Sequence, residues 1–219
     1  MSRDSATDVS TLMTAADWLG GVFAAPPEAE LVEAYAAPAG RDALARMGEW
    51  LNAREAARAL DQALTREAPA ALAVTLQRRY TALFEGIFPS SAVLPYESAW
   101  QPGADGTVLG GTPVTEMEAT LRELDLHVSS ECCEPADHLS IELAALAMAL
   151  RDGQKRLARA LIRRLQGWVP AFCAALARQD SGGFYAAAGD LLLALIHESS
   201  AALEREKAIA TERIEGEFA

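Results

Sequence analysis

The sequence has 219 residues, of which 51% are hydrophobic and 6% aromatic, and alanine supplies much of the apolar surface. These numbers suit one domain with a sizeable core of closely packed helices, because alanine loses no side-chain entropy in a helix. The 31 acidic and 19 basic residues give a net charge of −12, which argues against a nucleic-acid partner. The negative charge fits a surface that attracts cationic peptides, and it also fits a role in solubility alone.

Cysteine content and hydropathy indicate the cellular compartment. Cys132, Cys133 and Cys173 are too few for a disulfide framework, and they form no C-x-x-C motif. Residues 1–10 contain no basic segment leading into an apolar one, and no run approaches 18 uninterrupted apolar residues. We therefore expect the chain to stay in the cytoplasm, without stable insertion into a membrane.

Apolar residues recur at helical spacing along most of the chain, and there is no strand-like alternation of useful length and no internal repeat. The stripes that mark the predicted helices span residues 12–22, 31–35, 44–51, 56–64, 72–83, 114–124, 141–150, 157–172 and 184–195. We predict an all-α fold, a single-domain compact helical bundle of roughly nine to eleven helices over residues 1–219. The N-terminus (1–10) and the charged C-terminal tail (about 199–219) are expected to fray.

Prolines and threonine set the expected limits of several helices. Thr112 and Pro113 supply an N-cap and a first-turn proline. Pro135 is predicted to open a helix whose interior, residues 141–150, is apolar nearly all round and therefore central and buried. Pro170 falls inside the following long stripe, where we expect a kink or a break.

The least regular stretch is a long loop over about residues 86–111. A loop of this length inside a helical chain is more often functional than accidental. It contains Pro95, Tyr96, Glu97, Ser98 and Trp100. Just before it, Tyr80, Leu83 and Phe84 have the spacing of residues packed into a core on one helix face.

Enzyme signatures are absent from the sequence. It contains no G-x-x-x-x-G-K-[ST] phosphate loop, no G-x-G-x-x-G after a strand, no H-E-x-x-H and no G-x-S-x-G. We therefore predict that the protein is not an enzyme and has no catalytic residues.

One cluster contains residue types that bind metals, namely Cys132, Cys133, Glu134, Asp137 and His138. Adjacent cysteines cannot easily both reach one tetrahedral ion, and structural zinc sites usually separate their cysteines by two to four residues. We therefore expect loop or packed thiols before a helix start, and no metal site. The carboxylates of Glu134 and Asp137 fit such a helix start. Alternatively, Asp137 and His138 form a polar anchor facing an apolar groove, without the nucleophile that catalysis would need.

Three blocks of sequence resemble the TorD/DmsD-type family of redox-enzyme maturation chaperones, within the TorD/DmsD/NarJ superfamily. They are YTALF at 80–84, PYES at 95–98, and EPADHL at 134–139 running into Glu142 and Leu143. The third block is the most specific, and the resemblance covers roughly residues 72–196. Where the family often has a tyrosine and a glycine before the turn, this chain has Leu121 and Asp125.

The resemblance implies a cytoplasmic, cofactor-free chaperone for a molybdenum-cofactor oxidoreductase subunit. It would bind the twin-arginine signal peptide and the body of the precursor, aid cofactor insertion and delay export. Glu134, Asp137 and Glu97 would offer carboxylates to the arginines. His138 would orient Asp137 or contact the peptide backbone. The resemblance implies a groove for the hydrophobic stretch lined by Tyr80, Leu83, Phe84, Pro95, Tyr96 and Trp100, with Ser98 and Pro135 in the same blocks.

Three alternatives remain beside this interpretation. The client could be a non-exported oxidoreductase subunit of the nitrate-reductase type, whose bound segment lacks two adjacent arginines. The chain could be a helper that binds or hydrolyses GTP, or a helical scaffold that binds no signal peptide. We expect a monomer or a dimer, because helical chaperones with long loops can exchange elements between protomers.

Overall fold

The structure is a computed structural model that describes residues 9–87, 92–101, 109–127 and 134–217, with side chains as far as residue 205. Its elements are α1 (Val9–Ala24), α2 (Ala29–Ala36), α3 (Pro38–Trp50), α4 (Arg54–Leu64), α5 (Pro69–Phe84), the 3₁₀ helix η1 (Glu97–Trp100), α6 (Thr112–Glu123), α7 (Leu139–Arg151), α8 (Lys155–Gln179) and α9 (Phe184–Glu217). Within the described ranges every regular element is a helix, which confirms the predicted fold class. The expected fraying of residues 1–10 falls almost wholly outside these ranges.

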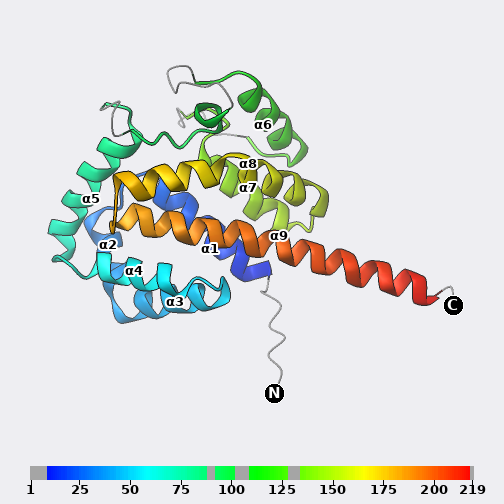
Figure 1. The fold of residues 1–219 in the computed structure, drawn as a ribbon, viewed down its shortest axis with the longest axis horizontal. Helices are drawn as coiled ribbons and strands as arrows, with labels where there is room; N and C mark the ends of the chain where they lie inside the picture. Colours follow the sequence, from blue (N-terminus) through cyan, green and yellow to red (C-terminus); the bar gives the residue numbers. More distant parts are fainter. Residues whose placement is uncertain (1–8, 88–91, 102–108, 128–133, 218–219) are drawn as a thin grey trace.

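Helix α7 is the central helix, packed against both α1 and α8 (Figure 1). Leu139, Leu143 and Leu146 are completely buried, as expected of a segment that is apolar nearly all round. Gly20 of α1 faces Leu143, and a β-carbon built there would lie 3.7 Å from the Leu143 Cβ. The small residue lets the two helix backbones approach closely.

An aromatic cluster joins α1, α5, α8 and α9. The ring of Phe84 lies 5.9 Å from Phe23, 6.3 Å from Phe172 and 5.2 Å from Tyr185, measured between ring centroids. Tyr80 packs 5.0 Å from Phe84 and donates its hydroxyl to the Phe23 carbonyl at 3.0 Å. These edge-to-face and stacked contacts fix the C-terminal end of α5 in the core, so the chain that follows starts from a rigid point.

Two helices do not begin where the sequence suggests. In α6, Thr112 is the first helical residue and Gly111 takes the N-cap position. Helix α7 begins at Leu139, and Pro135 instead opens a tight turn in which the His138 amide donates to the Pro135 carbonyl at 3.0 Å. The prediction that Pro135 opens the helix is therefore wrong. Tertiary pairing of this turn with the chain near residue 96 competes with helix formation.

Pro170 does not break α8, which continues from Lys155 to Gln179. A proline removes the hydrogen bond to the carbonyl four residues earlier, here that of Gln166. Both Pro170 and Gln166 lie on the exposed face of the helix, where water can satisfy the freed carbonyl. The buried neighbours Val169 and Phe172 hold the helix against the core. The expected break is therefore absent.

Asp125 adopts a left-handed backbone conformation, with φ of +55°. Glycine adopts this conformation without strain, and aspartate is among the few other residues that tolerate it. The TorD/DmsD-type family that the sequence resembles often has glycine at this position. The turn after α6 therefore requires a left-handed residue, and aspartate meets this requirement here.

Helix α9 continues beyond residue 199, where the sequence suggests that a frayed tail begins. Ser199 and Leu203 are buried, and the backbone is helical to Glu217, projecting from the bundle (Figure 1). By length and composition the segment Phe184–Arg205 could cross a membrane, but 56% of its most apolar window is buried inside the protein. This burial is that of a core helix.

Gly40→Ala is expected to destabilise the fold by about 1–3 kcal/mol, because the junction of α2 and α3 has no room for a methyl group. A β-carbon at Gly40 would collide with the carbonyl oxygen of Ala34 and lie 2.7 Å from that of Tyr35. Gly21→Ala, in an open position on α1, is the matched control and should stabilise by up to about 1 kcal/mol. The free energy of unfolding of both variants is measured in urea. Equal changes for Gly40→Ala and Gly21→Ala would contradict the close contact between Gly40 and the backbone of α2.

Candidate functional site

Two of the three sequence blocks meet as paired backbone segments, which we call the paired segments (residues 94–100 and 134–140). The Leu139 amide donates to the Pro95 carbonyl at 2.8 Å, and the Glu97 amide donates to the Asp137 carbonyl at 3.0 Å. Between them, Tyr96 and His138 form an isolated antiparallel bridge. Residues about 40 positions apart in the sequence are thereby held side by side.

Asp137 is completely buried at the centre of the paired segments. Its Oδ2 accepts a hydrogen bond from the Ser98 amide at 2.9 Å. Its Oδ1 has no hydrogen-bond partner among the described residues. A buried carboxylate oxygen without a partner is costly, so such an atom calls for an explanation.

Glu134 lies at the surface beside this buried carboxylate. The Tyr96 hydroxyl donates to Glu134 Oε2 at 2.5 Å, which aligns one face of the carboxylate and leaves the other to solvent. Burial raises the pKa of Tyr96, and the neighbouring Glu134 charge raises it further, so Tyr96 remains a hydrogen-bond donor at physiological pH. Pro135, half-buried, follows directly.

His138 caps α7, and its ring contacts Ser140 of the first turn. Its Nδ1 accepts from the Ser140 amide at 3.2 Å and lies 2.7 Å from the Ser140 hydroxyl. Burial lowers the pKa of the imidazole, although Glu134 and Asp137 oppose this effect, so the ring is neutral at pH 7. Tyr96 packs edge-on at 5.0 Å. The ring therefore starts the helix and supports Tyr96; its described contacts do not include the Asp137 carboxylate.

Glu97 is engaged within the protein and faces away from solvent. Its Oε2 lies 2.5 Å from Arg164 of α8, and its Oε1 accepts from Gln101 at 3.1 Å. Arg164 also contacts Glu142 of α7 at 3.2 Å, Glu116 of α6 at 3.4 Å and the Pro113 carbonyl. One guanidinium, whose side chain is only 11% exposed, thus connects η1, α6, α7 and α8.

Glu142 is the second carboxylate of this cluster and is fully buried. Trp168 donates its indole N–H to Glu142 at 3.1 Å. Burial, followed by the negative charge of Glu97, raises the pKa of Glu142 to about 8, while Arg164 and Trp168 act in the opposite direction. Glu97 and Glu142 face one guanidinium, and burial raises the pKa of both carboxyl groups, so the pair as a whole holds a proton more readily than two exposed carboxylates would.

Sequence reasoning missed Arg164 as part of this site. The signal was present: Arg164 lies three residues after Leu161 and four before Trp168, on the apolar stripe of α8. A charged residue on a buried helix face usually has buried partners of opposite charge. Glu142 belongs to the third block, and its contact with Arg164 explains why a carboxylate follows EPADHL inside a buried helix.

The first block lies in the core and not on a groove. Tyr80, Leu83 and Phe84 are buried in the aromatic cluster and expose at most 8% of their surface. Trp100 is half-buried, with its ring 6.0 Å from Phe172 and its indole N–H donating to the Leu94 carbonyl at 2.8 Å. In this conformation the first block supports the paired segments from behind, and the peptide-lining role that the resemblance assigns to it would require movement.

The predicted thiols Cys132 and Cys133 lie outside the described residues. Among the residues that are described, no group of three or more His, Cys, Asp or Glu side chains could hold a metal ion. Cys173 of α8 is buried, with its thiol donating to the Gly189 carbonyl at 3.4 Å, and burial raises its pKa to about 12. This thiol is a packed core group.

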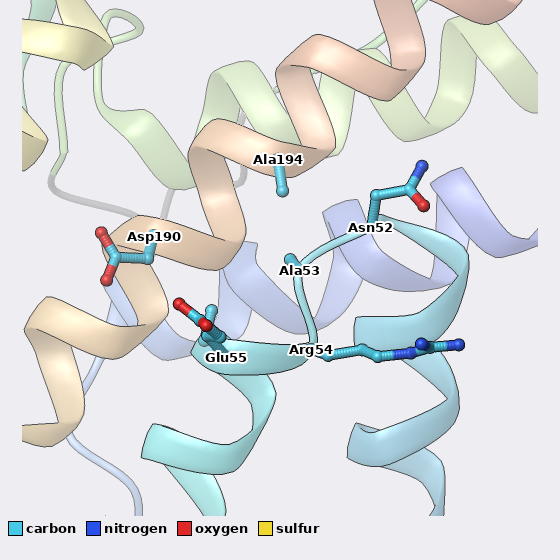
Figure 2. A pocket seen from close by; sticks show the side chains of 7 residues that line it. Asn52, Ala53, Arg54, Glu55, Asp190 and Ala194 are labelled. Atoms are coloured by element: carbon cyan, nitrogen blue, oxygen red, sulfur yellow. The ribbon is translucent and has the colours of Figure 1, made fainter.

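Two surface hollows are formed by other elements, and neither is lined by a residue of the paired segments. One of about 540 Å³ lies between the α3–α4 turn and α9 (Figure 2). Figure 2 shows Glu55 and Asp190 on one side of it and Asn52 on the other, with the Arg54 side chain directed away from Asp190. Asn52 donates to Glu198 of α9 at 2.9 Å, so this turn is fastened to the last helix.

Comparison with known proteins identifies the family. The chain matches the family described as nitrate reductase delta subunit over residues 51–174. It is 29% identical over 207 residues to the chaperone protein TorD of Vibrio parahaemolyticus, covering 85% of this chain and 91% of that protein. It is 30% identical over 170 residues to the chaperone protein TorD of Escherichia coli, covering 70% and 80%. The chain belongs to the TorD/DmsD/NarJ family of redox-enzyme maturation chaperones.

Membership in the TorD/DmsD/NarJ family agrees with the three blocks. The matched range, residues 51–174, contains all twelve residues of the expected site and also Glu142 and Arg164. The chaperone protein TorD of Photobacterium profundum is a further relative, 30% identical over 146 residues, covering 60% of this chain and 67% of that protein. The named relatives are chaperones and not enzymes, and this chain is likewise a chaperone and not an enzyme.

Proposed function

We propose that this TorD-family member is a cytoplasmic chaperone for a molybdenum-cofactor oxidoreductase subunit. It binds the twin-arginine signal peptide and the body of the precursor, aids cofactor insertion and delays export. Family membership supports the chaperone role, and the paired segments support a peptide site there. The observation that carries the site is the buried Asp137, whose Oδ1 has no partner among the described residues, next to the exposed Glu134.

The chemistry of this arrangement suits a guanidinium group. A carboxylate accepts two parallel hydrogen bonds from an arginine, and such charge-assisted bonds are stronger than neutral ones. Glu134 is exposed and already aligned by Tyr96, so it is the first contact for an incoming arginine. Asp137 is completely buried, so an arginine can reach its Oδ1 only if binding moves part of the protein. Glu97 is held by Arg164, so we assign it to positioning the loop and not to the ligand.

Pro95, Ser98 and Trp100 shape the same site through the backbone. The Pro95 carbonyl accepts a hydrogen bond from the Leu139 amide. The Ser98 amide donates to Asp137, and the Ser98 hydroxyl accepts from the Gly110 amide at 3.1 Å. The Trp100 ring is half-exposed at the edge of η1. The hydrophobic stretch behind the arginines would pack on this edge, and burial of apolar side chains would supply most of the affinity.

Glu134→Gln is expected to weaken binding of a twin-arginine peptide by about ten-fold or more, because one charge-assisted contact is lost. The measurement is calorimetry with a synthetic leader peptide that has two adjacent arginines before a leucine-rich stretch. Glu33→Gln makes the same charge change at an exposed position of α2 and is expected to leave the affinity unchanged.

The same peptide with both arginines replaced by glutamine provides the second comparison. It should bind the wild-type chain and Glu134→Gln equally weakly, because the contact under test is then absent from both. A wild-type chain that does not distinguish the two peptides would reject the twin-arginine site.

A second candidate client is a non-exported subunit of the nitrate-reductase type, which the matched family description favours. Retention of native partners on the tagged chain, followed by mass spectrometry, separates the two. An oxidoreductase precursor that still has its twin-arginine leader supports the first proposal. A leaderless oxidoreductase subunit supports the second.

A further inference from the structure

A cationic hollow of about 470 Å³ lies where the α4–α5 and α8–α9 connections meet. It shares no residue with the paired segments. Its lining includes the three arginines Arg66, Arg79 and Arg178, in a protein whose net charge is −12. The lining acids are Glu67 and Asp180, so the hollow has more positive than negative charge.

The carboxylate of Asp180 is fully used within the protein. Its Oδ2 accepts from the Tyr185 and Ala186 amides at 3.0 and 3.2 Å, which caps the first turn of α9. Its Oδ1 lies 2.8 Å from an Arg79 nitrogen, and Arg79 also donates to the Gln179 carbonyl at 2.5 Å. Asp180 and Arg79 therefore neutralise each other and form a rigid wall.

The other two arginines of the lining, Arg66 and Arg178, are available to bind an anion. Within the described part of the chain neither Arg66 nor Arg178 has an acidic partner, and both are exposed at the hollow. Glu67, the other acid of the lining, accepts a hydrogen bond from the Thr75 hydroxyl at 3.2 Å. Two guanidinium groups on one concave surface provide the forked donors that phosphate and carboxylate groups accept.

The rest of the lining favours a small ligand over bulk counterions. Leu72, Leu76 and Phe184 contribute apolar surface, and Ser181 contributes a hydroxyl. The volume falls within the range of about 300–1,000 Å³ typical of small-molecule sites. We propose that this hollow binds a small organic oxyanion, whose phosphoryl or carboxylate group lies between Arg66 and Arg178.

The test is calorimetric titration of the full chain with pyrophosphate and, separately, with citrate. Binding of pyrophosphate supports a phosphoryl ligand, and binding of citrate supports a carboxylate ligand. Arg66→Gln with Arg178→Gln is expected to weaken either affinity by at least about ten-fold, because charge-assisted contacts are lost. Binding should also weaken as sodium chloride is raised, since the site is partly exposed.

The matched control combines Arg58→Gln and Arg163→Gln, which removes two exposed arginines from α4 and α8 and changes the net charge equally. This control is expected to bind like the wild-type chain. Circular dichroism melts of both double variants establish that each is folded. The proposal is overturned if neither probe binds, if the Arg66 and Arg178 variant binds as tightly as wild type, or if the control loses as much affinity.

Discussion

Arg164→Met is expected to lower the free energy of unfolding by about 3–5 kcal/mol, because it leaves buried carboxylates without their cation. Arg164 exposes 11% of its side chain and contacts Glu97, Glu142 and Glu116. Methionine keeps much of the volume, so the loss reports charge and hydrogen bonding more than cavity formation. The measurement is urea unfolding at pH 7, with the slope checked for two-state behaviour.

Arg163→Met is the matched control, since the adjacent Arg163 is exposed on the same helix. Its effect should stay within about 0.5 kcal/mol. Adding Glu97→Gln to Arg164→Met should recover part of the loss, because the unpaired charge is then removed. Equal stability of the Arg163 and Arg164 variants would show that the cluster does not stabilise the fold.

Arg164 also has a consequence for the paired segments. It contacts Glu97 and the Pro113 carbonyl, which come before and after residues 101–110 in the sequence. Removing it should loosen η1, and Asp137 would lose its Ser98 partner as η1 moves. Lysine cannot replace it, because a single ammonium group lacks the fork that contacts several elements at once.

The stability of the wild-type chain relative to Glu142→Gln is expected to fall as pH rises from about 4.5 to about 8. Burial raises the pKa of Glu142 to about 8 from an ordinary value of 4.5. The folded state therefore binds more protons than the unfolded state in this window, so raising the pH favours unfolding. The full difference is on the order of 5 kcal/mol, and it should level off above pH 8.

The groups that face Glu142 are Glu97 of η1, Arg164 and Trp168 of α8 and, through Arg164, Glu116 of α6. Subtracting the Glu142→Gln curve cancels groups that titrate elsewhere, including His138, whose lowered pKa acts with the opposite sign. Chemical unfolding at pH 5, 7 and 9 gives the comparison, with exposed Glu118→Gln of α6 as control. Parallel curves for wild type and Glu142→Gln would mean that Glu142 is ionised in the folded protein.

Several features of the fold could be predicted from local sequence. The 3.6-residue period gives the helices, and the segment 141–150, apolar nearly all round, gives the buried α7, because a helix buried on most sides requires apolar residues on most sides. The order of the three blocks gives the family. The spacing of Tyr80, Leu83 and Phe84 also indicates a core face, and these residues do lie in the core.

Other features depend on contacts between segments far apart in the chain. Pro135 fits a helix start by local rules, but hydrogen bonds from the segment around Tyr96 hold residues 135–138 in a turn, so the helix begins at Leu139. Pro170 is a helix breaker by local rules, but packing on the buried side and water on the exposed side keep α8 continuous.

The sequence by itself determined the helical class, the central helix and the family, because periodicity and short motifs are local properties of a chain. Only the tertiary structure decided the roles of the charged residues. Glu97 is paired with Arg164, Asp137 is buried and Glu134 is exposed, although local sequence makes all three look alike as carboxylates near turns. The ionisation and availability of a carboxylate depend on its burial and on its partners across the fold, and neither is encoded in its immediate neighbours.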